Sequence, residues 1–458
     1  MSQKENKAKL VEGDVGLTLI KLTLPMMVGM VGMVIFNLVD AFFIGKLGTE
    51  ELAAMTFTLP IVLLQSSISM GLGVGASSVI SRLIGQGNHE QVKRQTTDSL
   101  IFSVLIVIVF VTIGLMTIKP LFSLLGARGI ILDYVRDYMS VWYCGVMFVV
   151  VPMIGNNAIR AAGNTVIPTI IMSTAIIINV IFDPLLIFGI GPFPRMGMKG
   201  AALATVFARA TTLCLSLFIL HHKFRMLTIK IPKLKELLHS WKEMLHVGIP
   251  AAITMLISPL SFGVVTKMIA VFGKEAVAAL GVGNRIELFA LSPLSALSSV
   301  LIPFIGQNIG AKRIERINKG LYFSQVLSFI IGLVMFFFFL IFKTEIALLF
   351  NKNQEVVDIL GWYLVIVSAS YGLLGIMFIN ASAFNALKKP INATIINFTR
   401  MFVLYIPLAY FFKNIWQVKG IFAGAFLSSV IVGIISLFWI KFELKQINKN
   451  YSNNRESS

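Results

Sequence analysis

Two aspartates lie inside segments that otherwise have the composition of lipid-soluble helices. Asp40 occurs in VIFNLVDAFFIG (34–45) and Asp183 in NVIFDPLLIFG (179–189). A charged side chain near the centre of a bilayer costs about 2.5 to 3.5 kcal/mol on insertion scales. Two buried carboxylates cannot both stay ionised cheaply, so either one keeps a proton or a cation lies between them. The pair predicts a site that binds H⁺ or Na⁺ in one state and releases it in another.

Oxygen-bearing side chains accompany both acids at helical spacing. Asn179 precedes Asp183 by four residues, and Asn37 precedes Asp40 by three. Residues three or four apart share one face of a helix, so each asparagine is expected beside its acid. Carboxylate and amide oxygens are ligands that a hard cation prefers. We expect Asp40 and Asp183 to hold Na⁺ if the chain is sodium-coupled; the alternative is that these polar groups only fix helix packing.

Depth along three helices indicates whether the acids can meet. At 1.5 Å per residue, Asp40 lies roughly 6 Å, Asp183 roughly 9 Å and Thr205 roughly 8 Å below the expected outer ends of their helices. These oxygens are therefore expected at one depth in the membrane, in the outer half of helices that belong to the first half of the chain. Pro184 removes a backbone donor, so we expect its helix to bend and to free carbonyl oxygens for an ion.

Apolar segments recur along the whole chain and must position these residues. The chain has 458 residues, of which 57% are hydrophobic and 13% charged, whereas soluble domains carry about 25% charged residues. Runs of about 20 apolar residues predict an all-α integral membrane protein. We expect twelve transmembrane helices, near residues 17–44, 52–81, 97–118, 132–155, 168–189, 200–221, 246–272, 276–306, 318–342, 356–382, 391–412 and 417–440.

Lysine and arginine predict the orientation in the membrane. About 24 of the 39 basic residues fall on the side of the N-terminus and about 12 on the other side. This bias predicts a multi-pass protein of the cell membrane with both termini in the cytoplasm. It also explains the net charge of +18 without a nucleic-acid partner. Three arginines fall inside the spans: Arg209, Arg285 and Arg400.

The two halves of the chain repeat each other. LTLPMMVGMVGMV from Leu22 matches VGIPAAITMLISP from Val247, and their prolines, Pro25 and Pro250, are 225 residues apart. LGTEELAAM (47–55) matches FGKEAVAAL (272–280) at the same offset. An even number of spans per half predicts two six-helix lobes in one orientation. We expect a first lobe over 1–220, a basic cytoplasmic linker over 221–245, a second lobe over 246–441 and a cytoplasmic tail over 442–458.

The acids are not shared between the halves. By the repeat offset Asp40 corresponds to Val265 and Asp183 to about Tyr405. Glu287 lies deep in the second half, two residues after Arg285, and residues two apart do not share a helix face. Both charges are either satisfied by neighbouring helices or line a second-lobe cavity where they handle substrate or cation.

Other chemistry is not indicated. Cys144 and Cys214 lie in apolar spans, where they are expected to be small buried hydrophobes rather than a disulfide or metal ligands. The sequence has no GxxxxGK[ST] phosphate-binding loop, so we expect no ATPase activity. We expect that the chain is not an enzyme.

Three segments resemble a known family. LPMMVGMVGMVIFNLVDAFFIGKLGTEELAA, NVIFDPLLIFG and GMKGAALATVFAR resemble helices 1, 5 and 6 of the multidrug and toxic compound extrusion (MATE) family, and the acids of the first lobe resemble its DinF-like branch. The resemblance implies an antiporter that uses Na⁺ or H⁺ and no cofactor. It implies a cation-coupling role for Asp40, Asn179, Asp183 and Thr205, and a supporting asparagine of helix 4, either Asn156 or Asn157.

The expected substrates are amphipathic, often cationic, small molecules. The chain has 21 Met and 36 Phe residues, and thioethers and aromatic faces accept varied rings and cations. External cation binding at the acids is expected to let the first helix bend or repack and to release the drug outward. The GMVGMV pattern (29–34) permits such close packing or bending. Membrane lipids are the other expected partners of a monomeric chain.

Three alternatives remain open at this point. A lipid-linked oligosaccharide flippase of the same superfamily is disfavoured by twelve spans and by the acidic first lobe. An intramembrane aspartyl protease would also need two membrane aspartates, but Asp183 lies in IFDP rather than in a GxGD context. A passive channel or receptor would need no coupling site.

Overall fold

The computed structural model describes residues 8–456, apart from the side chains of residues 37, 38, 41 and 450–456. The described chain is helical almost throughout and contains no strand. The predicted all-α fold is therefore confirmed. Lipid offers no hydrogen bonds to the backbone, and a helix satisfies its own amides and carbonyls.

The helices form two compact units. The first unit comprises Val28–Ile249 with the described residues up to Lys9, and the second comprises Leu10–Met27 and the described chain from Pro250 onward. Helices α1 (Val15–Gly45) and α8 (Leu234–Ile269) therefore each contribute residues to both units. The division falls close to Pro25 and Pro250 in these two helices, at the prolines that the sequence repeat aligns.

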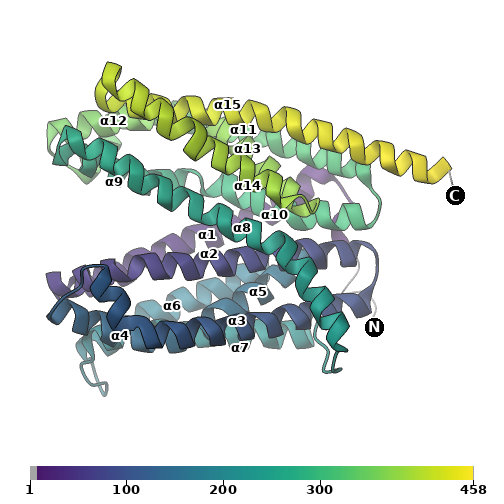
Figure 1. The fold of residues 1–458 in the computed structure, drawn as a ribbon, viewed down its shortest axis with the longest axis horizontal. Coiled ribbons are helices and arrows are strands. Elements are labelled where there is room, and N and C mark those ends of the chain that lie inside the picture. Colours follow the sequence, from purple (N-terminus) through teal and green to yellow (C-terminus); the bar gives the residue numbers. More distant parts are fainter. Residues whose placement is uncertain (1–7, 457–458) are drawn as a thin grey trace. The chain divides into compact units, whose positions relative to one another are not determined.

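Six further helices complete the first unit (Figure 1). They are α2 (Thr49–Gly85), α3 (His89–Leu124), α4 (Ile130–Gly145), α5 (Met147–Ala161), α6 (Val166–Phe188) and α7 (Gly197–His222). Two apolar clusters form the core of this unit, one around Met139 and Ile187 and the other around Ile154 and Met226.

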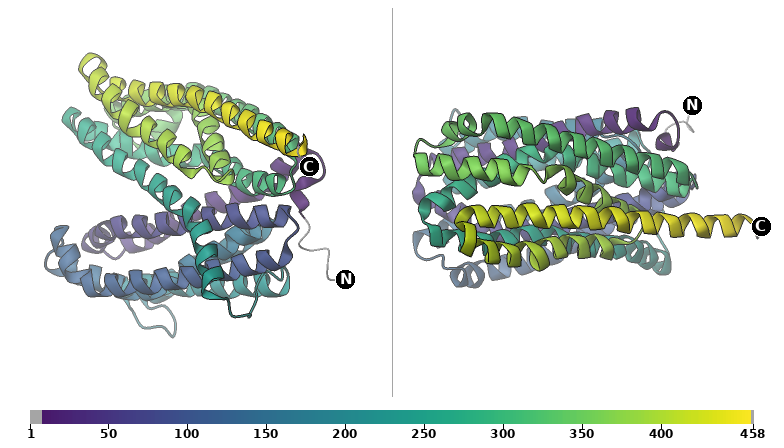
Figure 2. Two further views of the ribbon diagram at one scale, coloured as in Figure 1. Left: turned by 45° about the vertical axis from the view of Figure 1, so that its right-hand side comes forward. Right: turned by 90° about the horizontal axis from the view of Figure 1, so that it is seen from above.

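The second unit contains the later helices, and the C-terminal part of α15 projects beyond the others of its unit (Figure 2). The helices are α9 (Lys274–Ala290), α10 (Ser292–Gly310), α11 (Ile314–Phe350), α12 (Gln354–Ser368), α13 (Tyr371–Ala386), α14 (Pro390–Phe398) and α15 (Ile406–Glu456). A π-helical segment, Thr399–Tyr405, joins α14 to α15, and short 3₁₀ turns span Lys9–Val11 and Ala270–Phe272.

The number of spans agrees with the sequence. Among the described residues, eight helices are long and apolar enough to cross a membrane, and joining each bent pair raises the number to eleven. The pairs are α4 with α5, α9 with α10, and α12 with α13, bent by 41°, 46° and 52°. One of the eleven, Pro390–Lys449, itself turns at Trp416 and Gln417, where the backbone is not helical. Its two arms account for the twelfth predicted span.

Polar side chains hold the segment that precedes α1 against the second unit. The Leu10 amide donates to Oε1 of Gln307 at 3.0 Å, and Nδ2 of Asn308 donates to the Leu10 carbonyl at 3.0 Å. The guanidinium of Arg316 donates to the carbonyl of Gly13 at 2.7 Å. The amides of both α10 side chains are fully buried, so these hydrogen bonds fix the start of α1.

The segment before α8 is held in a similar way by α3. Arg94 pairs with the buried Asp98 and donates through Nη1 to the Lys230 carbonyl at 2.7 Å. The Thr228 amide donates to Oγ1 of Thr97 at 3.0 Å. In each unit, polar side chains thus bind the backbone just before a helix that contributes to both units.

Candidate functional site

The two acids come from different helices of the first unit. Asp40 lies on α1 and Asp183 on α6, and their side chains are 6% and 0% exposed. The two carboxylates lie close enough for their charges to interact. The structure therefore brings together the two acids singled out from the sequence.

Asn179 lies beside Asp183, and Thr205 is buried on α7, the helix that packs against α6. Nδ2 of Asn179 donates to Oδ1 of Asp183 at 3.0 Å, one helical turn away on α6. Thr205 is 9% exposed on α7. Gly200 lets α7 approach α6, because a Cβ at this position would lie 2.4 Å from the Leu186 carbonyl oxygen.

The four expected ligands share one property. Each has a buried oxygen without a hydrogen-bond partner among the described side chains: Asp40 Oδ1, Asn179 Oδ1, Asp183 Oδ2 and Thr205 Oγ1. An unsatisfied buried oxygen costs about 1 to 3 kcal/mol. Two carboxylates, an amide and a hydroxyl form a donor set that fits Na⁺, and the carboxylates equally fit a proton.

Glycines of α1 bring Asp40 toward α6. A Cβ at Gly29 would lie 3.2 Å from Oγ1 of Thr169, and a Cβ at Gly32 would lie 2.8 Å from Cδ1 of Ile176. Larger side chains would hold the two helices apart. This geometry agrees with the close packing expected from the GMVGMV pattern.

Two further residues belong to the acid site and had no role in the sequence analysis. Tyr138 of α4 is 4% exposed and lies within electrostatic reach of both acids. Arg209 of α7 lies within electrostatic reach of Asp40, and its guanidinium carbon is 4.6 Å from the ring centroid of Phe36. The spacing offered one signal, since Arg209 follows Thr205 by four residues on one helix face.

The residues that were expected to support the site do not form one group in the structure. The side chain of Asn37 lies outside the described residues. Asn156 is 6% exposed on α5, and among the described side chains nothing joins it to the acids. Asn157 donates instead to the Met153 carbonyl at 2.9 Å. Helix α6 continues through Pro184 to Phe188, so a functional bend at this proline stays a prediction.

Glu287 in the second unit has its own partners. The Tyr363 hydroxyl donates to Oε2 of Glu287. Gly283 makes room for that ring, since a Cβ there would lie 2.6 Å from Cδ1 of Tyr363. Arg400, in the π-helical segment, lies within electrostatic reach of Glu287 and donates to Oγ of Ser429 at 3.5 Å.

Arg285 has no hydrogen bond or ion pair among the described side chains, and it is exposed on α9. Arg285 does not pair with Glu287, in agreement with their two-residue spacing. The structure thus brings Glu287 to Tyr363 and Arg400, and it leaves Arg285 separate.

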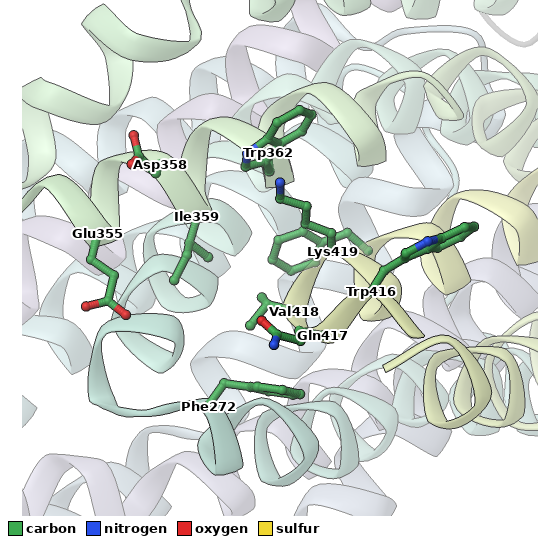
Figure 3. Close-up of a pocket in the computed structure, with 10 residues that line it drawn as sticks. Phe272, Glu355, Asp358, Ile359, Trp362, Trp416, Gln417, Val418 and Lys419 are labelled. Carbon is green, nitrogen blue, oxygen red and sulfur yellow. The ribbon is translucent and has the colours of Figure 1, made fainter. Parts of the chain in front are cut away.

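A cleft of about 450 Å³ lies elsewhere in the second unit (Figure 3). Trp362, Trp416 and Phe272 contribute aromatic walls, and Glu355 and Asp358 lie together on α12. Nζ of Lys419 lies 4.0 Å from the ring centroid of Trp362. The described residues that line it include none of the expected site residues, so this cleft is distinct from the acid site.

Comparison with known proteins gives one family. A family model described as MatE matches residues 25–185 and 250–411. The two matches begin at Pro25 and Pro250, so both halves of the repeat match the same model.

Individual relatives match nearly the whole chain. An FAD transporter of Shewanella oneidensis is 39% identical over 425 residues, covering 93% of this chain and 94% of that protein. Multidrug export protein MepA of Staphylococcus haemolyticus is 25% identical over 428 residues, covering 93% of each chain. The crystal structure of the Vibrio cholerae MATE transporter VcmN in the bent form aligns with a TM-score of 0.90 at 30% identity, covering 95% of this chain and 98% of that chain.

Proposed function

Because the chain belongs to the MatE family of membrane transporters, we propose that it is a cation-coupled antiporter exporting amphipathic small molecules by alternating access. The observation that carries the coupling is the set of four buried oxygens at Asp40, Asn179, Asp183 and Thr205. A cation bound here would supply the partner that these oxygens lack, which favours its binding. The position of the acids in the first unit also supports the DinF-like branch.

The charges at the site suit one monovalent cation. Asp40 and Asp183 supply two negative charges, and Arg209 supplies one positive charge within electrostatic reach of Asp40. One Na⁺ or one H⁺ brings this buried group to neutrality, which is the state that low-dielectric surroundings favour. Tyr138 supplies a neutral hydroxyl beside the acids.

The coupling step changes α1. Cation binding from outside neutralises the acids, which lets α1 bend or repack against α6 and releases the exported compound. Asn37, Asn156 and Pro184 support the site in this cycle. The protein acts as a monomer in the cell membrane with both termini in the cytoplasm.

Two classes of compound are candidate substrates. The relatives named multidrug export proteins favour drugs as substrates, and we propose amphipathic, often cationic ones. A second candidate, FAD, is favoured by the relative named FAD transporter, which is 39% identical over 93% of this chain. Both are bulky amphipathic compounds with aromatic rings, and Arg285 and Glu287 are proposed to handle substrate in the second unit.

Efflux from proteoliposomes under separate Na⁺ and pH gradients tests the coupling. Ethidium and FAD are the two reporter substrates. Asp40→Asn and Asp183→Asn are expected to abolish gradient-driven efflux, because each leaves the site with one carboxylate. Asp358→Asn, at an exposed acid of the separate cleft, is the matched control and is expected to retain efflux. Gradient-driven efflux that survives both site substitutions would refute the coupling proposal.

A further inference from the structure

The charges of the second unit are unevenly matched. Glu287, Arg400 and Arg285 lie in or beside membrane-spanning segments. Glu287 accepts a hydrogen bond from Tyr363 and has Arg400 within electrostatic reach. With that carboxylate already engaged, Arg285 is left as an uncompensated positive charge.

Arg285 lies inside the bent pair of helices α9 and α10, which together are long and apolar enough to cross a membrane. It follows the first residue of α9, Lys274, by eleven positions, which corresponds to about 16 Å along the helix. Arginine inside a membrane span faces water or a polar partner rather than lipid, because exposure to lipid is costly. Its exposed side chain therefore faces an aqueous path.

The same face of α9 offers space and apolar surface. Ala278 and Gly281 precede Arg285 by seven and four residues, and a Cβ at Gly281 would have no neighbour within 4 Å. Leu288 and Phe289 follow it by three and four residues and are 55% and 37% exposed. A flat ring can lie along this face with its anionic group at the guanidinium.

Resting on the proposed export function, we propose that Arg285 binds a phosphate group of the substrate, and that the exported compound is an aromatic phosphate ester. A guanidinium donates two parallel hydrogen bonds to a phosphate, and such charge-assisted hydrogen bonds are roughly twice as strong as neutral ones. A cationic compound would instead be repelled at this position. The acids of the first unit would repel the phosphate, so ion and substrate use chemically opposite sites.

Riboflavin and FMN differ only in one phosphate group, so this pair of flavins isolates its contribution. Riboflavin carries the ring system alone, FMN adds one phosphate, and FAD adds a diphosphate with a nucleoside. Binding to the full-length protein in nanodiscs is measured by quenching of flavin fluorescence. Wild-type protein is expected to bind FMN and FAD about tenfold or more tightly than riboflavin, because a charge-assisted pair is worth that much.

Substitutions at Arg285 supply the decisive comparison. Arg285→Gln is expected to weaken FMN and FAD binding about tenfold and to leave riboflavin binding unchanged. Arg285→Lys keeps the charge and is expected to retain part of the preference. Lys419→Gln removes another exposed cation of the second unit and is expected to leave all three affinities unchanged.

Two outcomes would overturn the assignment. One is equal affinity of the wild type for riboflavin and FMN, and the other is an equal loss of all three ligands in Arg285→Gln. Unchanged riboflavin binding shows that the variant is folded. The export proposal is judged separately, by whether Asp40→Asn abolishes gradient-driven efflux of ethidium or FAD, so the failure of one is distinguishable from the failure of the other.

Discussion

At the scale of single residues, the acid site depends on oxygens that need a partner. Asp183 receives one hydrogen bond from Asn179 on Oδ1, while its Oδ2 has none among the described side chains. The hydroxyl of Thr205 is in the same condition. Removing any one of the unpaired oxygens is therefore expected to weaken cation binding without leaving a new unsatisfied group.

Thr205→Val tests this with almost no change in shape. We expect the apparent affinity for the coupling cation to fall about tenfold, since one ligand oxygen is lost. Thr205→Ser restores the hydroxyl and is expected to restore most of the affinity. The measurement is the cation concentration that gives half-maximal efflux, and equal values for Val and wild type would remove Thr205 from the ligand set.

Arg209 is expected to weaken cation binding by its own charge. Arg209→Gln removes a positive charge within electrostatic reach of Asp40, so a cation should bind more tightly and a second one should be admitted. Charge moved per substrate exported, measured on solid-supported membranes, is expected to rise in Arg209→Gln and to stay at the wild-type value in Arg209→Lys. An unchanged ratio in both variants would contradict this role.

At the scale of helices, small residues set the distances that the site needs. Gly200 of α7 lies against the backbone of Leu186 in α6, and Gly32 of α1 lies against Ile176. If the helices that carry the ligands move apart, the ligands no longer reach the ion, because cation–oxygen distances fall in a narrow range. The glycines that bring these helices together are thus part of what makes the site possible.

Gly200→Ala is expected to destabilise the protein by about 1 to 3 kcal/mol through overpacking. The new methyl group would meet backbone atoms, which cannot move aside as a side-chain end can. Gly263→Ala on α8 is the control, because a Cβ there has no neighbour within 4 Å. Thermal unfolding in detergent compares the two, and a Gly200→Ala protein as stable as the control would disprove the close contact.

The hydrogen bonds that hold the segment before α1 are expected to slow the exchange of its amides with solvent. Gln307→Leu removes the acceptor of the Leu10 amide, so this amide is expected to exchange with solvent faster. Lys319→Gln, at an exposed position of α11, is expected to leave exchange unchanged. Hydrogen–deuterium exchange of the N-terminal peptide measures both, and unchanged protection in Gln307→Leu would show that the segment is held by other contacts.

At the scale of the whole molecule, basic residues predict the topology. Cys144 and Cys214 are exposed, so the prediction that they are buried is wrong. In a background with Cys144→Ser and Cys214→Ser, Lys352→Cys is expected to react with an impermeant maleimide in intact cells. Lys235→Cys is expected to react only after permeabilisation, because basic segments stay in the cytoplasm. Both positions are exposed. The opposite labelling pattern would reverse the orientation and the direction of the proposed cycle.

The sequence by itself determined the membrane-spanning helical fold, the duplication and the family. Apolar runs of sufficient length have one stable form in lipid, and the repeat is visible at Pro25 and Pro250 as a constant offset. Spacing within one helix was equally decisive, since it placed Asn179 beside Asp183 and kept Arg285 apart from Glu287.

Only the tertiary structure decided which helix faces meet. Residue spacing defines the faces on which Asp40 and Asp183 lie, but the packing of α1 and α6 decides that those faces converge. The same holds for Tyr138, which comes from a third helix. Glu287 accepts a hydrogen bond from Tyr363, which lies 76 residues away in the sequence. Such contacts depend on side-chain volumes at helix crossings, which no periodicity in the sequence records.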